Sequence, residues 1–335
     1  MMASLRAGLI GLGMMGANHA RVLSSLDGVE LVGVVDPVAE SPLHLPYLPR
    51  VDSVGDLIAQ GLDYCVVAAP TAYHRELAME LAAAGVHALI EKPLTVDVES
   101  ALLLQQAFES AGLIGAVGHI ERYNASLQQA RTRIANGDLG EIYQISTRRQ
   151  GPFPGRISDV GVILDLATHD IDLTAWVAQR SYTRVSAQTA HRSGRPHEDL
   201  VAVTGQLADG TVTNHLVNWL SPLKERVTTI TGEKGAFVAD TITADLTFFR
   251  NGVVPTDPGL ARFRGVREGD MTRFAFPKPE PLRVEHENFR DAVLGLDADI
   301  VALAQAASTV AVANAVARSA RTSTSVPVES VEVTA

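Results

Sequence analysis

Three glycines and one aspartate near the start of the chain have the types and spacing of a phosphate-binding turn. Gly11, Gly13 and Gly16 match the pattern G-x-G-x-x-G, and Asp36 follows twenty residues after the last of them. In such a turn the first glycine allows a tight bend, the second lets the main chain approach a pyrophosphate, and the third lets a helix pack close to a strand. A carboxylate at Asp36 accepts hydrogen bonds from a ribose diol. These residues predict a dinucleotide-binding site.

The elements around the glycines come in the order that such a site requires. Apolar runs at Ala7–Ile10 and Val29–Val35 predict two buried parallel strands, and a helix is predicted over Met14–Leu23. Because free N–H groups at the start of a helix attract phosphate, we expect Met14 and Met15 to border the cofactor together with the glycines.

A second segment follows the next predicted strand, at the sheet edge where open α/β sheets bind their ligands. Pro70, Thr71 and His74 come directly after the apolar run Tyr64–Ala69 and are expected to line the cofactor. Alternatively, Thr71 is the N-cap of the helix predicted to follow. Both interpretations are compatible.

A third segment, Glu91-Lys92-Pro93, follows the predicted strand His87–Ile90. We therefore expect Glu91 and Lys92 to lie at the same edge of the sheet as the dinucleotide. A lysine there can donate a hydrogen bond to a substrate hydroxyl and stabilise a developing alkoxide. The alternative is a surface lysine at a strand end.

Acidic residues flank a histidine later in the chain. Asp165, His169 and Asp172 have the spacing i, i+4, i+7, which places them on one face if the segment is helical. A histidine oriented by carboxylates is suited to proton transfer. The alternatives are an acid at a helix N-terminus beside a buried, hydrogen-bonded histidine, or a divalent metal site. The metal site is disfavoured because no second histidine stands at ligand spacing nearby.

The order of strands and helices predicts two domains. Residues 1–120 alternate strands and helices and are assigned to a Rossmann domain, with the remaining strands at His87–Ile90 and Gly115–Gly118. Residues 121–335 are assigned to an α+β domain with a large open antiparallel sheet, since its alternating runs are separated by glycine-rich turns. The strands predicted there are Ile142–Arg149, Tyr182–Ala190, Leu200–Leu207, Val212–Trp219, Val227–Thr231 and Ala236–Asp240. Helices are predicted at His74–Ala84, Val98–Ala111, Asn124–Asn136 and Asp299–Ala320, and Gly252–Pro281 is predicted to be irregular.

Composition narrows the kind of partner. The chain has 335 residues, of which 46% are hydrophobic, so it can form full cores. A net charge of −10 argues against nucleic acid or an anionic membrane as the main partner. The single cysteine, Cys65, lies in an apolar run and is expected to be a small buried filler. Neither a signal peptide nor an apolar run of membrane-spanning length is seen, so a cytoplasmic protein is expected.

Apolar residues on both alternations of Val212–Trp219 predict a homodimer or homotetramer formed through the sheet.

These motifs together resemble the family of glucose-fructose oxidoreductase, inositol dehydrogenase and rhizopine catabolism proteins, along essentially the whole chain. The resemblance implies an NAD(P)-dependent dehydrogenase with a Rossmann domain followed by an open-faced α/β domain. It makes Lys92, Asp165 and His169 the catalytic residues, with the histidine as acid and base. The cofactor-binding residues would be Gly11, Gly13, Met14, Met15, Gly16, Asp36, Pro70, Thr71, His74, Glu91 and Lys92.

Four segments are similar to the nucleotide-sugar branch of that family, namely 118–124, 151–156, 159–165 and 218–224. This implies hydride transfer at a ring carbinol, C3, of a sugar such as a UDP-N-acetylhexosamine. The substrate-binding residues would be His119, Arg122, Asn124, Arg149, Arg156, Asp165 and His169. Arginines in Arg148–Arg156 would meet the pyrophosphate through charge-assisted hydrogen bonds.

Three other functions stay open. A dehydrogenase of a free polyol such as inositol would share the catalytic residues and differ around the substrate arginines. A 3-ketosugar reductase of an antibiotic-sugar pathway would run the reaction in the opposite direction. A non-enzymatic dinucleotide-binding regulator is expected to lack Lys92 or His169, and both are present.

NAD is predicted in preference to NADP. No basic residue stands at positions 37–41 after Asp36, and Glu40 adds negative charge where a 2′-phosphate would lie. Arg50 is the nearest arginine downstream, and it lies beyond a loop with three prolines that would have to fold it back.

Overall fold

The computed structural model describes residues 4–37, 48–155, 160–252, 269–329 and 331. They form two compact units: Met1–Ile120 with Glu280–Ala311 and Ser330–Ala335, and Glu121–Pro279 with Val312–Glu329. The division of the chain into domains 1–120 and 121–335 stays a prediction. By their contacts, however, residues 280–311 group with the first unit.

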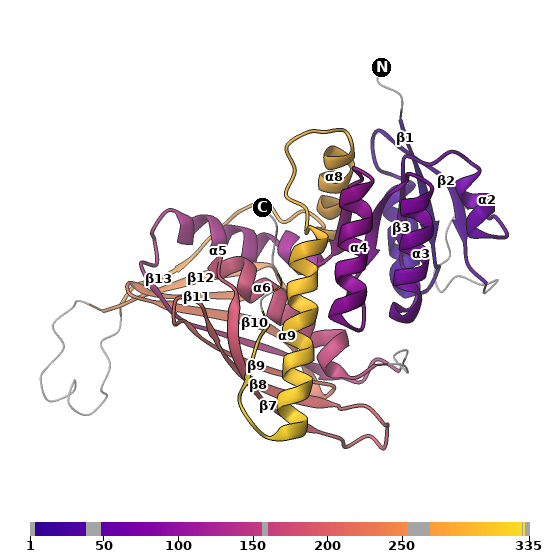
Figure 1. Cartoon of the computed structure of the whole chain (residues 1–335). Coiled ribbons are helices and arrows are strands. Elements are labelled where there is room, and N and C mark those ends of the chain that lie inside the picture. Colours follow the sequence, from indigo (N-terminus) through magenta and orange to yellow (C-terminus); the bar gives the residue numbers. More distant parts are fainter. Residues whose placement is uncertain (1–3, 38–47, 156–159, 253–268, 330, 332–335) are drawn as a thin grey trace, which may run out of the picture. The chain divides into compact units, whose positions relative to one another are not determined.

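The first unit contains a five-stranded sheet with the order β2-β1-β3-β4-β5, in which all neighbouring strands are parallel (Figure 1). The strands are β1 (Leu5–Ile10), β2 (Val29–Val35), β3 (Tyr64–Val67), β4 (His87–Glu91) and β5 (Gly115–Gly118). This is the predicted Rossmann arrangement. The apolar strand sequences suit it, because a parallel sheet with helices on both faces buries both sides of each strand.

Helices cover both faces of this sheet. They are α1 (Met14–Leu23), α2 (Val54–Ile58), α3 (Thr71–Ala83), α4 (Val98–Ser110), α8 (Pro281–Val293) and the first half of α9 (Leu303–Thr322). Successive residues of β3 point to opposite cores: Cys65 and Val67 to one, Tyr64 and Val66 to the other. Figure 1 shows α3 and α4 side by side over the sheet. Helix α8 was not predicted; its Phe289 packs edge-on against Tyr64 with ring centroids 5.3 Å apart.

The second unit contains a nine-stranded sheet with the order β13-β12-β11-β10-β6-β9-β8-β7-β14. Its strands are β6 (Ile142–Pro152), β7 (Tyr182–Ala190), β8 (Leu200–Leu207), β9 (Val212–Asn218), β10 (Leu220–Gly232), β11 (Gly235–Asp240), β12 (Asp245–Arg250), β13 (Met271–Arg273) and β14 (Val326–Pro327). The predicted antiparallel sheet is confirmed with one difference, since β6 and β9 pair in parallel. Strands β12 to β14 were not predicted, and β13 lies within the segment expected to be irregular.

Helices α5 (Ala125–Ala135) and α6 (Thr168–Ala178) cover one face of the large sheet (Figure 1). Their core includes Leu173 and Trp176 from α6 together with Ile230 and Phe237 from the sheet. On the sheet itself, Val212, Leu216 and Phe249 are 49%, 37% and 43% exposed.

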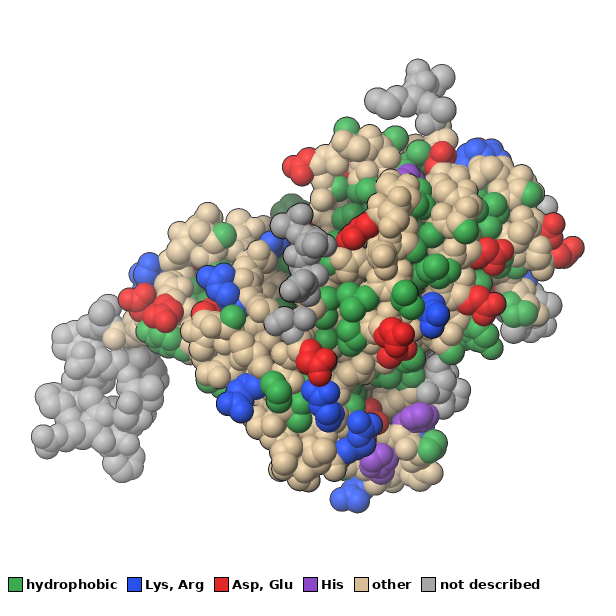
Figure 2. All heavy atoms as spheres, viewed as in Figure 1, with side chains coloured by type: hydrophobic (Ala, Val, Ile, Leu, Met, Phe, Trp, Pro, Cys, Tyr) green, Lys and Arg blue, Asp and Glu red, His purple; other side chains and the backbone are tan. Residues whose placement is uncertain are grey.

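No helix among the described residues is long and apolar enough to cross a membrane. Figure 2 shows acidic and basic side chains interspersed over the visible face, without a continuous basic stripe.

Candidate active site

The glycine turn forms an open cradle at the start of α1. Gly11 has a φ of +95°, and a Cβ atom there would lie 2.6 Å from the carbonyl oxygen of Ala68. A Cβ on Gly16 would lie 2.0 Å from the carbonyl oxygen of Gly11, so these two positions require glycine. At Gly13, by contrast, no atom lies within 4 Å of an added Cβ. This open space beside free helix N–H groups fits a pyrophosphate.

Asp36 lies where the second strand meets this turn. Its carboxylate accepts a hydrogen bond from the main-chain N–H of Leu12, which ties the end of β2 to the glycine turn. The N–H of Gly11 donates to the carbonyl of Val35 at 2.8 Å. A carboxylate can accept more than one hydrogen bond, and the binding of a ribose diol by Asp36 stays a prediction.

The chain after the three-proline loop returns to β2. Arg50 forms an isolated parallel bridge with Val34, two residues before Asp36. Main-chain hydrogen bonds from Val34 to Pro49 (2.8 Å) and from Val51 to Val34 (3.0 Å) hold it there. The downstream arginine is therefore folded back toward the strand that ends at the predicted ribose site.

His74 lies between two predicted cofactor segments. Its Nε2 is 2.8 Å from the carbonyl oxygen of Ala69, and its Nδ1 is 3.0 Å from that of Pro93. The side chain is buried, and burial is the main reason why the pKa of His74 lies below its ordinary value. His74 thus holds the turn after Lys92 against the end of β3. Helix α3 has Pro70 rather than Thr71 at its N-cap, so the alternative interpretation of Thr71 is wrong.

Glu91, the last residue of β4, is buried and holds the main chain of Lys92. Its Oε2 accepts from the main-chain N–H of Lys92 at 3.0 Å, and its Oε1 is 2.9 Å from His19 Nε2. Burial raises the pKa of Glu91, but the interactions with His19 and Lys92 outweigh burial, so the pKa lies below its ordinary value. Glu91 is therefore ionised beside the lysine. Its partner His19 was not predicted as a site residue.

The segment that carries Asp165 is not the regular helix that was predicted. Ile163–Ala167 forms a π-helical turn (η2), and α6 begins only at Thr168. Glu198 accepts hydrogen bonds from the main-chain N–H groups at the start of this turn. Ile163 N–H donates to the Glu198 carboxylate at 3.0 Å, and Val162 N–H donates to the Glu198 carbonyl oxygen at 3.1 Å. Because a π-turn has more residues than an α-turn, the predicted helical spacing from Asp165 to His169 is altered, whereas His169 and Asp172 lie within the regular helix α6. Such turns are frequent at functional sites.

Two buried arginines hold α6 in place. Arg122 donates from Nε and Nη2 to both oxygens of Asp172, each at 2.7 Å. Arg149 donates from Nε to Asp170 and from Nη1 to Glu121, each at 2.8 Å. Such charge-assisted pairs are strong and directional. Asp172 is therefore the partner of Arg122 in a buried ion pair.

The remaining substrate candidates have different environments. His119 and Asn124 are buried, and the Asn124 side chain caps α5 by accepting from Ser126 N–H at 3.1 Å. Arg148 is exposed and pairs with Glu225 at 2.8 Å. Arg156 lies outside the described residues. His169 is half-buried, at the first turn of α6.

Arg226 on β10 was not predicted as a site residue; its side chain is 36% exposed and interacts electrostatically with Asp165. It stands opposite Arg149 in the pairing of β10 with β6, and its Nη1 lies 3.5 Å from Glu121. Burial lowers the pKa of Arg226, as does the charge of Arg149, whereas Glu121, Asp170 and Asp165 raise it. Sequence alone offered no signal, because a single arginine in an alternating strand has no distinctive spacing.

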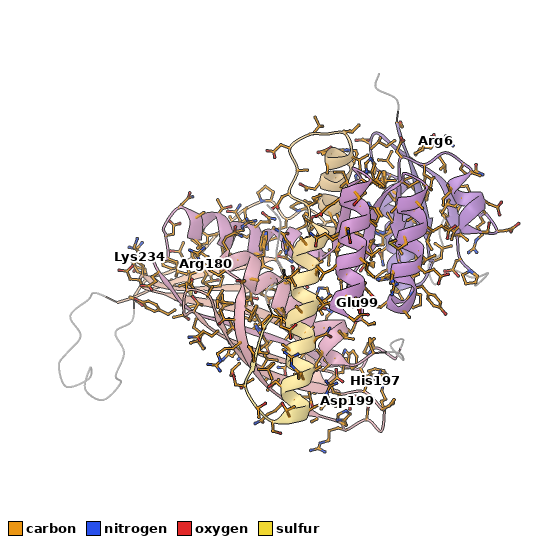
Figure 3. The ribbon with its side chains drawn as sticks, in the orientation of Figure 1. Arg6, Glu99, Arg180, His197, Asp199 and Lys234 are labelled. Carbon is orange, nitrogen blue, oxygen red and sulfur yellow. The ribbon has the colours of Figure 1, made fainter. Side chains whose placement is uncertain are left out.

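The loop between β7 and β8 was also missed. Besides Glu198, it contributes Arg195, whose guanidinium stacks 4.4 Å from the Phe153 ring and 5.0 Å from the Trp219 ring. Asp199 holds the loop by accepting from the N–H groups of Arg192 (2.7 Å) and Ser193 (2.9 Å). His197 and Asp199, which are labelled in Figure 3, belong to this loop. In sequence the segment is an ordinary polar loop.

A parallel sheet with an open phosphate cradle and a supported lysine at a strand end is typical of dinucleotide-dependent oxidoreductases. Residues 5–119 match the family described as "Oxidoreductase family, NAD-binding Rossmann fold". Residues 127–238 match the "GFO/IDH/MocA C-terminal domain". The chain belongs to the GFO/IDH/MocA family, as its motifs predicted. It is an NAD-dependent oxidoreductase that acts on a CH–OH group.

Named relatives include sugar and inositol dehydrogenases. UDP-N-acetylglucosamine 3-dehydrogenase of Acidithiobacillus ferrooxidans is 30% identical over 87% of this chain and 90% of its own. A solved structure of that enzyme, GnnA, matches with a TM-score of 0.84 at 26% identity, covering 96% of this chain and 99% of its own. The scyllo-inositol 2-dehydrogenase (NAD(+)) of Bacillus subtilis is 27% identical over 54% of this chain and 56% of its own.

Proposed function

We propose that this protein transfers a hydride between NAD and a ring carbinol, C3, of a nucleotide-linked sugar such as a UDP-N-acetylhexosamine. The observation that carries the proposal is the likeness to UDP-N-acetylglucosamine 3-dehydrogenase across both units of the chain, whereas the inositol dehydrogenase aligns over little more than half. Because the alignment with UDP-N-acetylglucosamine 3-dehydrogenase covers 87% of this chain, it favours the nucleotide sugar over inositol.

The cofactor is held by the first unit. N–H groups at Gly13, Met14 and Met15 face the pyrophosphate, and the Asp36 carboxylate accepts from the adenosine ribose. Pro70 and Thr71 line the same edge of the sheet. When bound, the nicotinamide ring supplies the carbon that accepts or returns the hydride.

Lys92, Asp165 and His169 are the catalytic residues in this proposal. In the oxidative direction neutral His169 removes the hydroxyl proton, and Lys92 donates a hydrogen bond to the developing alkoxide. Asp165 orients the substrate or the histidine. In the reductive direction protonated His169 returns the proton to the carbonyl oxygen.

We assign substrate binding to His119, Asn124, Arg156 and Arg226. Arg122 and Arg149 already donate to buried carboxylates, so we assign them to holding α6. Arg226 is a better candidate for the anionic part of the substrate, since its side chain is 36% exposed and that of Arg149 is 3% exposed.

The test is a panel of nucleotide sugars, free sugars and inositols, each read by NADH absorbance in both directions. We expect the highest kcat/KM with a UDP-N-acetylhexosamine. A best substrate without phosphate would make the protein a polyol or sugar dehydrogenase. Turnover only from NADH and a 3-keto sugar would make it a ketosugar reductase. Cofactor binding without any turnover would favour the regulator.

The same proposal includes a homodimer or homotetramer formed through the large sheet. The exposed apolar side chains of Val212 and Leu216 on β9 support it, because apolar side chains on an open sheet are suited to an interface with a partner.

A further inference from the structure

Four buried polar side chains lie together behind the Lys92 turn, and the proposed chemistry gives none of them a proton-transfer step. They are His19 on α1, Glu91 at the end of β4, and Glu285 and His286 on α8, and each is at most 7% exposed. His19 Nε2 lies 2.9 Å from Glu91 Oε1, and His19 Nδ1 lies 2.8 Å from His286 Nε2. Glu285 has no hydrogen-bond partner at either carboxyl oxygen.

The distances indicate where the protons of this chain of hydrogen bonds lie. Ionised Glu91 can only accept, so His19 Nε2 carries a proton. Burial holds the pKa of His286 well below its ordinary value, so His286 is neutral. If His286 donates from Nε2 to His19 Nδ1, its own unpartnered Nδ1 is an acceptor. The opposite assignment would bury an unpaired N–H donor at that atom, which costs more.

These hydrogen bonds join the three elements on which the lysine and the cofactor depend. Helix α1 begins at the dinucleotide turn, β4 ends immediately before Lys92, and α8 closes the cluster. Glu91 links the lysine to helix α1: its Oε2 accepts from the main-chain N–H of Lys92, and its Oε1 is hydrogen-bonded to His19 Nε2. A Cβ on Gly118 of β5 would lie 3.2 Å from the Glu91 carboxylate, so the neighbouring strand also confines it.

We propose that His19 and His286 are positioning residues for Lys92: through Glu91 they hold the main chain of the lysine in register with the helix that begins at the dinucleotide turn. The role deepens the proposed function, on which its turnover measurement rests. Neither histidine touches substrate in this role.

Two amide substitutions separate the two hydrogen bonds of His19. In His19→Gln the side-chain amide takes the place of Nε2 and still donates to Glu91. In His19→Asn the amide takes the place of Nδ1 and the bond to Glu91 is lost. We expect His19→Asn to lower kcat by about 10- to 100-fold, the range for a small displacement of a reacting group, and His19→Gln to lower it by less than about threefold. The dissociation constant of NADH should change by less than about twofold in both, because the glycine turn is intact.

His87→Leu is the matched control. His87 is the first residue of the same strand, and its Nδ1 accepts from the N–H of Ile114 at 2.8 Å. Its loss should lower the unfolding temperature and leave kcat within about twofold. If His19→Asn does not fold, His286→Leu removes the other end of the chain of hydrogen bonds and should lower kcat in the same direction.

A second measurement needs no sugar. Pyridoxal 5′-phosphate followed by borohydride labels lysine amines, and peptide mass spectrometry gives the rate at Lys92. We expect His19→Asn to change that rate by more than about threefold and both His19→Gln and His87→Leu to leave it unchanged. Wild type that turns over no panel sugar would overturn the proposed function, while the labelling rates still decide this role. Equal behaviour of His19→Asn and His19→Gln, or of His19→Asn and His87→Leu, in both measurements would overturn the positioning role.

Discussion

At the scale of single residues, Lys92 is the sharpest test of the proposed chemistry. The hydrogen bond from its main-chain N–H to the Glu91 carboxylate does not depend on the Lys92 side chain. Lys92→Ala should lower kcat/KM by about 10²- to 10⁴-fold, the range for losing one electrostatic or proton-transfer group, with NADH binding and the unfolding temperature little changed. Steady-state kinetics and a thermal unfolding curve check both parts. Turnover close to that of wild type would remove Lys92 from the catalytic set.

His169 should set the pH dependence of the reaction. Oxidation needs the neutral imidazole, so its rate should rise with pH through the range of about pH 5 to 8 in which histidine titrates, and reduction should show the reverse. His169→Asn should lower turnover by a factor similar to that of Lys92→Ala and flatten both profiles in that range. Rates with full pH dependence in the variant would contradict the assignment.

Cofactor preference depends on Asp36 and on the residue that the fold brings beside its strand. A 2′-phosphate near the Asp36 carboxylate costs about 1 kcal/mol in water and more in a partly buried site, so NAD should bind more tightly than NADP. The main chain of Arg50 bridges to Val34, two residues before Asp36, so we propose Arg50 as the cation that would soften this cost. Arg50→Ala should weaken NADP and leave NAD unchanged in fluorescence titrations. Tighter binding of NADP by wild type would reverse the prediction.

Glu285 should make stability depend on pH. Burial raises the pKa of its carboxyl well above 4.5, and the charge of Glu91 adds to the shift. A carboxyl whose folded pKa is raised contributes stability that is fully present below its unfolded pKa and is lost as pH rises through the folded pKa. Glu285→Gln should therefore gain unfolding free energy relative to wild type as pH rises from about 4.5, as followed by urea denaturation. Glu287→Gln, on the exposed side of the same helix, should show no such gain.

At the scale of elements, α6 is anchored by buried ion pairs between its own carboxylates and arginines of other elements. Both carboxylates that anchor it, Asp170 and Asp172, bind arginines from other elements, and all four side chains are buried. Asp172→Asn leaves the Arg122 guanidinium without its charge partner, and breaking a buried pair in this way costs about 3–5 kcal/mol.

The control for that prediction is an exposed pair in the same unit. Arg133 and Asp138 lie 3.3 Å apart with side chains 30% and 44% exposed, and Asp138→Asn should cost no more than about 1 kcal/mol. Urea denaturation of the two variants gives the comparison. Equal losses would show that the buried pair contributes no more than a surface contact.

At the scale of the whole molecule, association through the large sheet is directly measurable. Light scattering coupled to gel filtration should give the mass of a dimer or tetramer. Leu216→Arg places a charge on the exposed side of β9 and should shift the mass toward the monomer, because an unpaired buried charge is costly. Leu296→Arg, at a leucine of the first unit that is 58% exposed against 37% for Leu216, should leave the mass unchanged. A monomeric wild type would overturn the prediction.

Patterns confined to neighbouring residues could be predicted from the sequence. The glycine turn, its strands and the helix after it follow from fixed offsets and from apolar runs that a parallel sheet buries on both faces. Strands Tyr182–Ala190 and Leu200–Leu207 have the bounds that their alternation predicts, since side chains point to opposite faces in turn. The family, the NAD-dependent chemistry and the type of fold were all available at this level.

Only the tertiary structure decided which residues that lie far apart in sequence become hydrogen-bond partners. His19 and His286 are separated by 267 residues, Arg122 and Asp172 by 50, and Glu198 and the π-turn at Ile163 by 35. Sequence spacing cannot show such pairs, because a charged or polar side chain is equally compatible with solvent until the fold buries it. Arg149 illustrates the difference: its sequence context predicts a phosphate contact, and its burial between Glu121 and Asp170 makes it a support for the helix that carries His169. The local patterns determined what chemistry the chain performs, and the long-range packing decided which side chains hold that chemistry in place.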